Sequence, residues 1–272
     1  MRYETIQQLK DTDFKRLTGV QRETFEKMLE VVQKGLRDFG RPTKLRRADQ
    51  LLLTLMYWRE YRTEFHIGQS YGISEATVCR TIQKVENALV RSGRFRLPGK
   101  KALQPSDTLF EVVLVDVSEQ PIERPKKGQK RHYSGKKKRH TQKAQVMADQ
   151  KTTEIVATAF SHGSKHDFQL FKDDRREMAE HIRILADAGY QGLAELHENC
   201  QTPFKKSKYH PLTQKEKQSN RTLARKRILI EHIFRRLKIF RILSERYRNR
   251  RKRFALRFNL IAAIYNLELN LL

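Results

Sequence analysis

The sequence predicts an α/β protein in two parts: an N-terminal all-α domain with a helix-turn-helix, followed by a mixed-sheet domain. Apolar residues recur at helical spacing through the first hundred residues. Residues 98–107 then combine glycine and proline with no periodicity, which predicts a linker. A continuous apolar run at 109–119 opens a series of strand-like segments. We therefore expect a helical domain at 1–97 and a second domain at 108–272.

Two helices are predicted in the N-terminal domain ahead of the helix-turn-helix. The first covers residues 18–40 and stops at Gly40, just before Pro42, because glycine favours a helix end and proline cannot continue a helix. The second covers residues 46–61 and carries the apolar run LLLTLMYW. Both present apolar residues at a spacing that would face a common core.

A helix-turn-helix is predicted between residues 61 and 93. A short helix leads to a turn at Gly72, and a recognition helix follows over Ser74–Val85, with Ser74 as its N-cap. In such motifs the start of the second helix contacts DNA, so Ser74, Thr77 and Arg80 are the candidate contacts. The alternative is a three-helix packing unit that never touches DNA.

The second domain is predicted to alternate strands with helices in an order that fits a mixed sheet and not a doubly wound one. A Ser134-Gly135 turn should divide a hairpin within it. The expected strands are 109–119, the two halves of 132–149, 152–163, 182–192 and a short one in 200–206; the expected helices are 165–181, 220–243 and 252–270.

The charge balance points to a polyanionic partner. The formal net charge is +26 and the pI is near 10.3, and each phosphate that such a protein neutralises releases condensed counterions. A membrane-surface role is the competing idea, but the apolar runs at 51–58 and 260–272 are too short or too polar to span a bilayer. The N-terminus has no signal-peptide pattern, and Cys79 and Cys200 have no partner spacing, so we expect a cytoplasmic, nucleoid-associated protein without a membrane role.

The most basic stretch runs from Arg124 to Lys143. It holds ten Lys or Arg residues and no acid, and it spans the predicted hairpin. Its central side chains are candidate DNA contacts, and a solvated hairpin is the alternative. These candidates are Lys136, Lys137, Lys138 and Arg139.

Three carboxylates stand where catalysis could use them. Asp116 and Asp187 each end an apolar strand, and adjacent strands would bring them to one edge of the sheet. Glu231 lies in a basic helix that could pack on that sheet. Clustered carboxylates are unfavourable unless a cation neutralises them, and their hard oxygen atoms suit Mg²⁺ or Mn²⁺. A turn or helix cap is the alternative for each strand-end aspartate taken alone.

The predicted helix around Glu231 gathers cations beside one acid. At about 100° per residue, Arg227 and Arg235 lie roughly 40° from Glu231 and Lys238 roughly 20° from it. A solvated face with salt bridges between residues four apart would explain this pattern without any site. A metal-binding acid flanked by phosphate-binding cations would explain it as well.

Taken together, these segments resemble the DDE transposases of bacterial insertion sequences, of the insertion-sequence family five type. The resemblance covers nearly the whole chain and is carried by VDVSEQPIERPKKGQKRHYSGKKKRHTQKAQVMAD, SHGSKHDFQLFKD, LADAGYQG, TPFKK and RKRILIEHIFRRLKIFRIL. The family signature Arg-x3-Glu-x6-Lys is matched by Arg227, Glu231 and Lys238. The resemblance implies an RNase H-like fold, with Asp116, Asp187 and Glu231 as catalytic, metal-binding residues. It also implies that Arg227 and Lys238 hold transposon-end DNA near the scissile phosphate.

The function that the resemblance implies is DNA transposition. Two Mg²⁺ (or Mn²⁺) ions would support cleavage and strand transfer, terminal inverted repeats and target DNA would be the partners, and a complex of two ends would need at least a dimer. One departure is Val117-Ser118 after the first aspartate, where relatives have a small residue and threonine. The alternatives are a decayed or co-opted DNA-binding protein and a metal-dependent nuclease unrelated to transposition.

Overall fold

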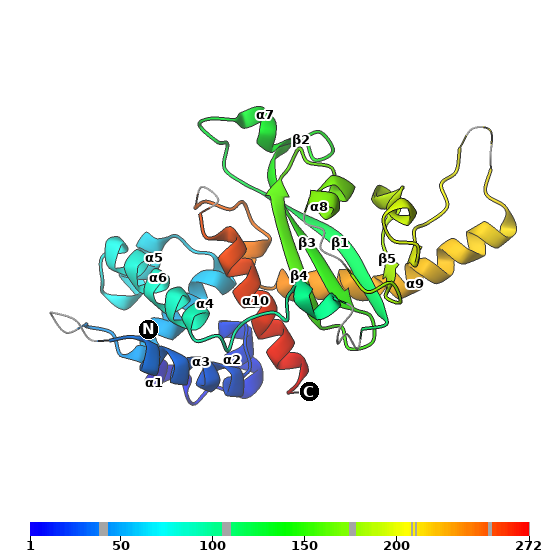
Figure 1. Ribbon diagram of the computed structural model, residues 1–272. Coiled ribbons are helices and arrows are strands. Elements are labelled where there is room, and N and C mark those ends of the chain that lie inside the picture. The colour runs from blue at the N-terminus through cyan, green and yellow to red at the C-terminus, as the bar shows by residue number, and fades with distance from the viewer. Residues whose placement is uncertain are drawn as a thin grey trace. The chain divides into compact units, whose positions relative to one another are not determined.

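The chain divides into two compact units in the computed structural model (Figure 1). Unit 1 comprises residues 1–96, 237–246 and 252–272, and unit 2 comprises residues 97–236 and 247–251. The structure describes residues 1–37, 43–104, 110–173, 178–207, 209, 211–249 and 252–271.

The division differs from the predicted domains at the C-terminal end. Unit 2 begins at Leu97, close to the predicted linker, of which residues 105–107 lie outside the described part. The predicted domain at 108–272, however, is shared between the units. The last helix, α10 (Phe254–Leu269), buries apolar residues such as Phe258 and Ile261 among the helices of unit 1. An almost wholly apolar helix must be enclosed by other elements, and helices with apolar faces provide that enclosure.

Unit 1 is built around a central buried helix. In α4, Leu51, Leu52, Leu53 and Trp58 are fully buried, and the other helices pack around them. The helices of this unit are α1 (Tyr3–Ile6), α2 (Asp11–Thr18), α3 (Arg22–Gly35), α4 (Arg47–Glu60), α5 (Glu64–Tyr71), α6 (Glu75–Arg91), the short η4 (Arg241–Leu243) and α10.

The helix-turn-helix is formed by α5 and α6. Gly72 joins them with φ of +66°, a left-handed conformation that glycine adopts without strain. The Ser74 hydroxyl accepts a hydrogen bond of 3.3 Å from the Thr77 N–H, which confirms the predicted N-cap. The recognition helix continues past Val85, its predicted end, to Arg91, because buried Leu89 extends the apolar face by another turn.

The first predicted helix of unit 1 is shorter than expected. α3 ends at Gly35, and Leu36 is already extended. The predicted stop at Gly40 and Pro42 lies outside the described residues.

Unit 2 contains a mixed sheet in the order β4-β3-β1-β5-β6, with β2 pairing the start of β3. β3 pairs antiparallel with both β1 and β4, whereas β5 runs parallel to β1 and β6 parallel to β5. The predicted mixed sheet is therefore confirmed. Its strands are β1 (Val112–Pro121), β2 (Tyr133–Ser134), β3 (Arg139–Asp149), β4 (Ile155–His162), β5 (Arg183–Leu185) and β6 (Cys200–Gln201).

Helices and short turns connect these strands. Tyr190, Phe171 and Met147 are buried together on one side of the sheet, where they anchor the segments that follow β4 and β5. The helices of this unit are α7 (Gln129–His132), α8 (Asp167–Asp173), α9 (Gln214–Leu237) and the 3-10 turns η1 (Lys100–Leu103), η2 (Ala188–Tyr190) and η3 (Leu193–Glu195).

Several predicted elements of unit 2 have different lengths in the structure. The helix expected at 165–181 is α8, which covers only Asp167–Asp173, and residues 178–181 are not helical. The strand expected at 182–192 ends at Leu185, because the Asp187 carboxylate caps a 3-10 turn. The helix expected at 220–243 begins earlier, at Gln214, and ends at Leu237, before Lys238. Along the described segments, no helix combines the length and the apolarity needed to cross a bilayer.

Candidate active site

Two of the predicted catalytic carboxylates occupy equivalent positions relative to a pair of neighbouring strands: Asp116 lies within β1, and Asp187 lies two residues beyond the end of β5. The parallel pairing of β1 with β5 places Leu114 opposite Leu185. Asp116 and Asp187 each follow their paired leucine by two residues. Because side chains alternate along extended backbone, this offset directs both carboxylates to the same face of the sheet. Their electrostatic coupling supports this placement, since Asp187 contributes to the raised pKa of Asp116.

Buried partners hold the segment that carries Asp187. Its Oδ1 accepts a hydrogen bond of 2.8 Å from the Gly189 N–H, which closes the start of η2. Three residues after Asp187, Tyr190 is 1% exposed and its hydroxyl accepts a 2.8 Å hydrogen bond from the Gln145 side chain. These contacts connect the turn to β3 and fix the position of the carboxylate.

Burial dominates the electrostatics of Asp116. The pKa of Asp116 is raised to about 6; desolvation is the largest cause, and nearby Asp187 and Asp167 contribute to the rise. The Val117 N–H donates a hydrogen bond of 2.8 Å, and the Arg227 guanidinium lies 3.7 Å away; both oppose the rise. Two carboxylates on one face of the sheet supply part of the oxygen ligand set that a divalent cation prefers.

Glu231 is exposed on α9, one helical turn beyond Arg227. Within the described residues it forms no ion pair, and Arg227 contacts Asp116 instead. The predicted salt bridges between residues four apart around Glu231 are therefore wrong, because the Arg227 side chain turns toward the sheet. Nor does any group of three His, Cys, Asp or Glu side chains in the described segments lie close enough together to hold a metal ion. The structure thus assembles two of the three predicted carboxylates.

The other predicted DNA contacts on this part of the chain are exposed. Arg235 lies on the outer face of α9, whereas Lys238 follows the last residue of that helix. The helical angle expected between Lys238 and Glu231 therefore does not apply. Lys136, Lys137, Lys138 and Arg139 are all exposed at the turn between β2 and β3, where Lys138 adopts a φ of +52°.

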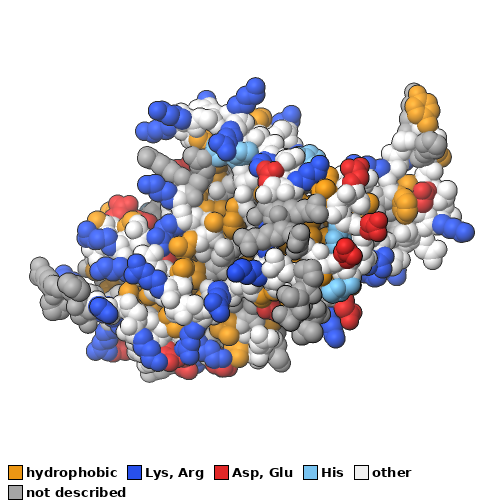
Figure 2. All heavy atoms as spheres, viewed as in Figure 1, with side chains coloured by type: hydrophobic (Ala, Val, Ile, Leu, Met, Phe, Trp, Pro, Cys, Tyr) orange, Lys and Arg blue, Asp and Glu red, His pale blue; other side chains and the backbone are white. Residues whose placement is uncertain are grey.

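A broad basic groove of about 1570 Å³ leads across unit 2 to Asp187. Figure 2 shows Lys and Arg side chains gathered over α7 and β2, at the top of the view. Lysine and arginine side chains along a groove suit the phosphates of a nucleic-acid backbone. The charged residues that line the groove are Arg124, Lys130, Arg131, Lys136, Lys143, Lys165, Asp167, Asp187 and Lys205.

Lys143 is a charged residue of this groove that the sequence pattern did not single out. Its ammonium lies 2.8 Å from Asp167 and donates a 2.6 Å hydrogen bond to the Lys165 carbonyl oxygen, and its side chain is 11% exposed. Asp167 occupies the first turn of α8, and it also contributes to the charge around Asp116. The signal in the sequence was its place as the last cation of the basic run from Arg124 to Lys143.

Val117, which stands where relatives have a small residue, does not disturb the face of the sheet that carries Asp116 and Asp187. Val117 packs against the apolar core on the other face of the sheet from Asp116, and its backbone φ is not positive. A bulky side chain at this position is therefore accommodated as in any strand.

The predicted DNA contacts of unit 1 lie on the first turns of α6. Arg80 is exposed and Thr77 half-exposed, whereas the Ser74 hydroxyl is engaged in capping. A helix-turn-helix, together with a mixed sheet that carries two aspartates and a basic groove, is typical of a DNA-processing enzyme.

Comparison with known proteins identifies the family. Residues 107–267 match the family described as "Transposase DDE domain", and residues 43–95 match "Helix-turn-helix of DDE superfamily endonuclease". A "Probable transposase for insertion sequence element IS702" of Microchaete diplosiphon is 48% identical over 274 residues, which cover 100% of this chain and 99% of that protein. No solved structure matches. The chain belongs to the DDE transposases, and the predicted resemblance to DDE transposases of insertion sequences, the helix-turn-helix and the enzyme class are confirmed.

Proposed function

We propose that this protein binds the terminal inverted repeats of its insertion sequence and cleaves and joins DNA strands. Its catalytic residues in this proposal are Asp116, Asp187 and Glu231. The observation that carries this proposal is the register of β1 and β5, which brings two aspartates to one face of the sheet beside a basic groove. Family membership supplies the reaction class, and the register supports the assignment of these particular residues.

Asp116 and Asp187 would hold the metal ions, with Glu231 as the third ligand. Carboxylate oxygens are the preferred ligands of Mg²⁺ and Mn²⁺. Two such ions, when bound, would activate water or a DNA 3′-hydroxyl and stabilise the leaving oxygen. Glu231 is one turn from Arg227, which contacts Asp116, and its exposed side chain can reorient at little cost.

Cations of this chain would hold the DNA backbone during the reaction. The Nε atom of Arg227 is buried and, within the described part of the chain, has no hydrogen-bond partner, so it can donate to a phosphate beside Asp116. The lysines of the β2–β3 turn and Lys143 would track the backbone along the groove. Arg235 and Lys238 would add contacts from the region of α9.

Recognition of the inverted repeats is assigned to the start of α6. Ser74, Thr77 and Arg80 lie in its first two turns, which are the part of a recognition helix that reads bases in the major groove. Because two transposon ends must be joined to one target, the active assembly would contain at least two copies of the chain.

The decisive experiment is a strand-transfer assay with the full chain. Labelled DNA ending in the inverted repeat and a supercoiled target plasmid are incubated with Mg²⁺, Mn²⁺ or EDTA. Joining should require the metal, and Asp116→Asn, Asp187→Asn and Glu231→Gln should each abolish cleavage while end binding persists. Exposed Glu198→Gln removes a carboxylate elsewhere in unit 2 and should leave joining unchanged. Near-normal joining by any of the three site variants would refute its assignment.

Glu231 is exposed, and among the described residues it belongs to no group of three side chains that could hold a metal ion. This position favours a second candidate function. This candidate is a DNA-binding protein without catalysis. Tight end binding with no metal-dependent cleavage would establish it. Cutting without joining would instead indicate a nuclease unrelated to transposition.

A further inference from the structure

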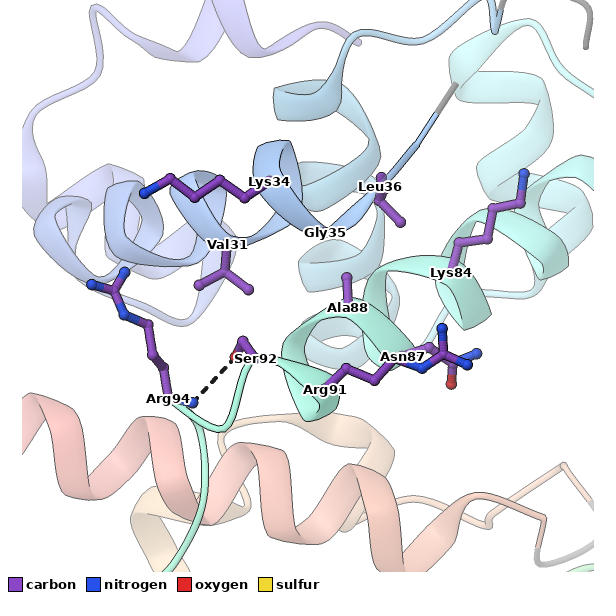
Figure 3. A pocket seen from close by; sticks show the side chains of 10 residues that line it. All are labelled: Val31, Lys34, Gly35, Leu36, Lys84, Asn87, Ala88, Arg91, Ser92 and Arg94. Carbon is purple, nitrogen blue, oxygen red and sulfur yellow. Dashed lines mark hydrogen bonds between the residues drawn. The ribbon is translucent and has the colours of Figure 1, made fainter. Parts of the chain in front are cut away.

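A second concavity lies in unit 1, between the C-terminal ends of α3 and α6 (Figure 3). Its volume is about 570 Å³, which is within the usual range of ligand sites. All of its lining residues belong to unit 1, so it is separate from the basic groove of unit 2. No role assigned above uses it.

Small residues bring the two helices together at the floor of this concavity. A Cβ atom on Gly35 would lie 3.1 Å from the Ala88 Cβ, so only glycine allows so close an approach without adjustment. Val31 and Ala88 are buried beside this contact, and half-buried Leu36 completes an apolar floor. Charges placed around an apolar floor are screened less than charges in open water.

The rim of the concavity is cationic. Lys34, Lys84, Arg91 and Arg94 line it, and none of its lining residues is acidic. Glu30, just outside the lining, lies 2.6 Å from Lys34 and 2.8 Å from Arg94, and these two cations lower the pKa of Glu30 to about 2. One carboxylate therefore serves two cations, and the rim keeps a positive excess.

Lys84 and Arg91 supply most of that excess. Both are exposed on α6, and in the part of the chain that the structure describes neither forms an ion pair. Figure 3 shows them on one side of the pocket, with Lys34 and Arg94 on the other. Arg91 is seven positions after Lys84, so both side chains lie on the same face of the helix. Their Cα atoms are about 10 Å apart along the helix axis. That distance spans about three phosphates of one DNA strand, which are spaced by about 3.4 Å along its axis.

We propose that this cationic pocket is a second DNA-backbone site, independent of sequence. It rests on the proposed function, in that α6 is taken as the helix that reads the inverted repeat. The 17 residues of α6 extend for about 24 Å, whereas the major groove is about 12 Å wide. When the Ser74 end lies in a major groove, the pocket at the Arg91 end therefore meets phosphates outside that groove. An acidic protein segment is the competing occupant, but the strong positive charge of this DNA-processing chain favours DNA.

The test measures binding of a short duplex that lacks the inverted repeat, by fluorescence anisotropy over a range of salt concentrations without divalent metal. Lys84→Ala/Arg91→Ala should weaken binding on the order of tenfold and reduce the slope of log K against log salt by about 2. The matched control is Lys10→Ala/Arg16→Ala, which removes one lysine and one arginine from exposed positions of unit 1 outside the pocket. Thermal melting establishes that each variant is folded, as expected because alanine favours helices.

Each outcome supports or overturns the proposal. Equal slopes for the wild type and the pocket variant, or equal losses in the pocket and control variants, would overturn it. Displacement of the duplex by polyglutamate as effectively as by unlabelled DNA would assign the pocket to an acidic protein partner. If the wild type joins ends in the strand-transfer assay and the pocket variant binds the duplex normally, this proposal alone fails. If the wild type binds no DNA, the proposed function fails with it.

Discussion

A carboxylate in each unit is withdrawn from solvent, fully in the case of Glu86 and partly in the case of Asp116, and the two have opposite surroundings. In unit 1, Glu86 is fully buried and accepts hydrogen bonds from Trp58 at 3.1 Å, Arg257 at 2.6 Å and Arg253 at 2.5 Å. In unit 2, Asp116 has one backbone donor and a guanidinium at 3.7 Å, with other carboxylates nearby. The first charge is compensated on all sides, whereas the second is not.

This difference separates a structural charge from a reactive one. A buried carboxylate with a full set of donors ties elements together, here α4, α6 and α10. A carboxylate whose pKa is raised toward neutral pH by desolvation and by like charges is typical of functional sites. Substrate or metal completes the environment of such a group. Variants at the two positions should therefore act in opposite directions on stability.

Glu86→Ala should have the largest effect. It leaves Arg257, which is 2% exposed, buried without its counter-charge, and removal of one partner from a buried ion pair costs about 3–5 kcal/mol. Urea unfolding would measure the loss. Glu245→Ala, which removes an exposed glutamate of unit 1, serves as the control and should change stability by less than about 1 kcal/mol. If Glu86→Ala changed the free energy of unfolding as little as the control does, Glu86 would not be the stabilising charge that its hydrogen bonds indicate.

Asp116→Asn should raise stability while it abolishes cleavage. One pKa unit corresponds to about 1.36 kcal/mol, so the rise in the pKa of Asp116 from 3.8 to about 6, which already includes the opposing effect of Arg227, predicts a gain of about 3 kcal/mol in the metal-free protein at neutral pH. Chemical unfolding in EDTA measures it, with Glu198→Gln as the control for charge removal. A destabilised Asp116→Asn variant would show that Arg227 compensates the charge more fully than its 3.7 Å distance indicates.

The same carboxylate predicts a pH dependence of stability. The pKa of Asp116 rises from 3.8 to about 6 in the folded state, so between these values the folded protein binds more protons than the unfolded chain. The contribution of Asp116 to stability is therefore fully present below about pH 4 and is lost as the pH rises through about 6. Unfolding titrations of the wild type and of Asp116→Asn isolate this contribution, because other groups titrate in both. Parallel curves would contradict the prediction.

The sequence predicted the mixed sheet and the two aspartates because local signals encode them, but Asp116 lies within β1, which continues to Pro121, and not at a strand end. Apolar runs that end in an acid locate Asp116 and Asp187, and the Ser74 cap follows from its position before an amphipathic helix. The Gln145–Tyr190 contact is not encoded locally, since it joins residues 45 positions apart across the sheet. Nor does sequence periodicity reveal that the Arg227 side chain turns to Asp116 and away from Glu231.

The assignment of α10 to unit 1 is the other feature that local sequence signals did not predict. α10 follows the catalytic segment in sequence, yet Arg253 and Arg257 bind Glu86 on the recognition helix. An apolar helix predicts burial but not the partner against which it is buried. The partner is determined by a charge pair whose members are 171 residues apart.

The smallest predicted effect concerns the start of the recognition helix. Ser74→Ala removes the 3.3 Å hydrogen bond to the Thr77 N–H and should destabilise unit 1 by about 1 kcal/mol, whereas Ser74→Asp should retain the cap. Thermal unfolding would measure both. If Ser74 only caps α6, DNA-end binding should fall for alanine in proportion to the unfolded fraction. If it also contacts DNA, Ser74→Asp should keep stability but weaken end binding, because the added charge faces phosphates. This pair of variants therefore separates the structural role of an exposed polar residue from its recognition role, as Glu86 and Asp116 do for buried charges.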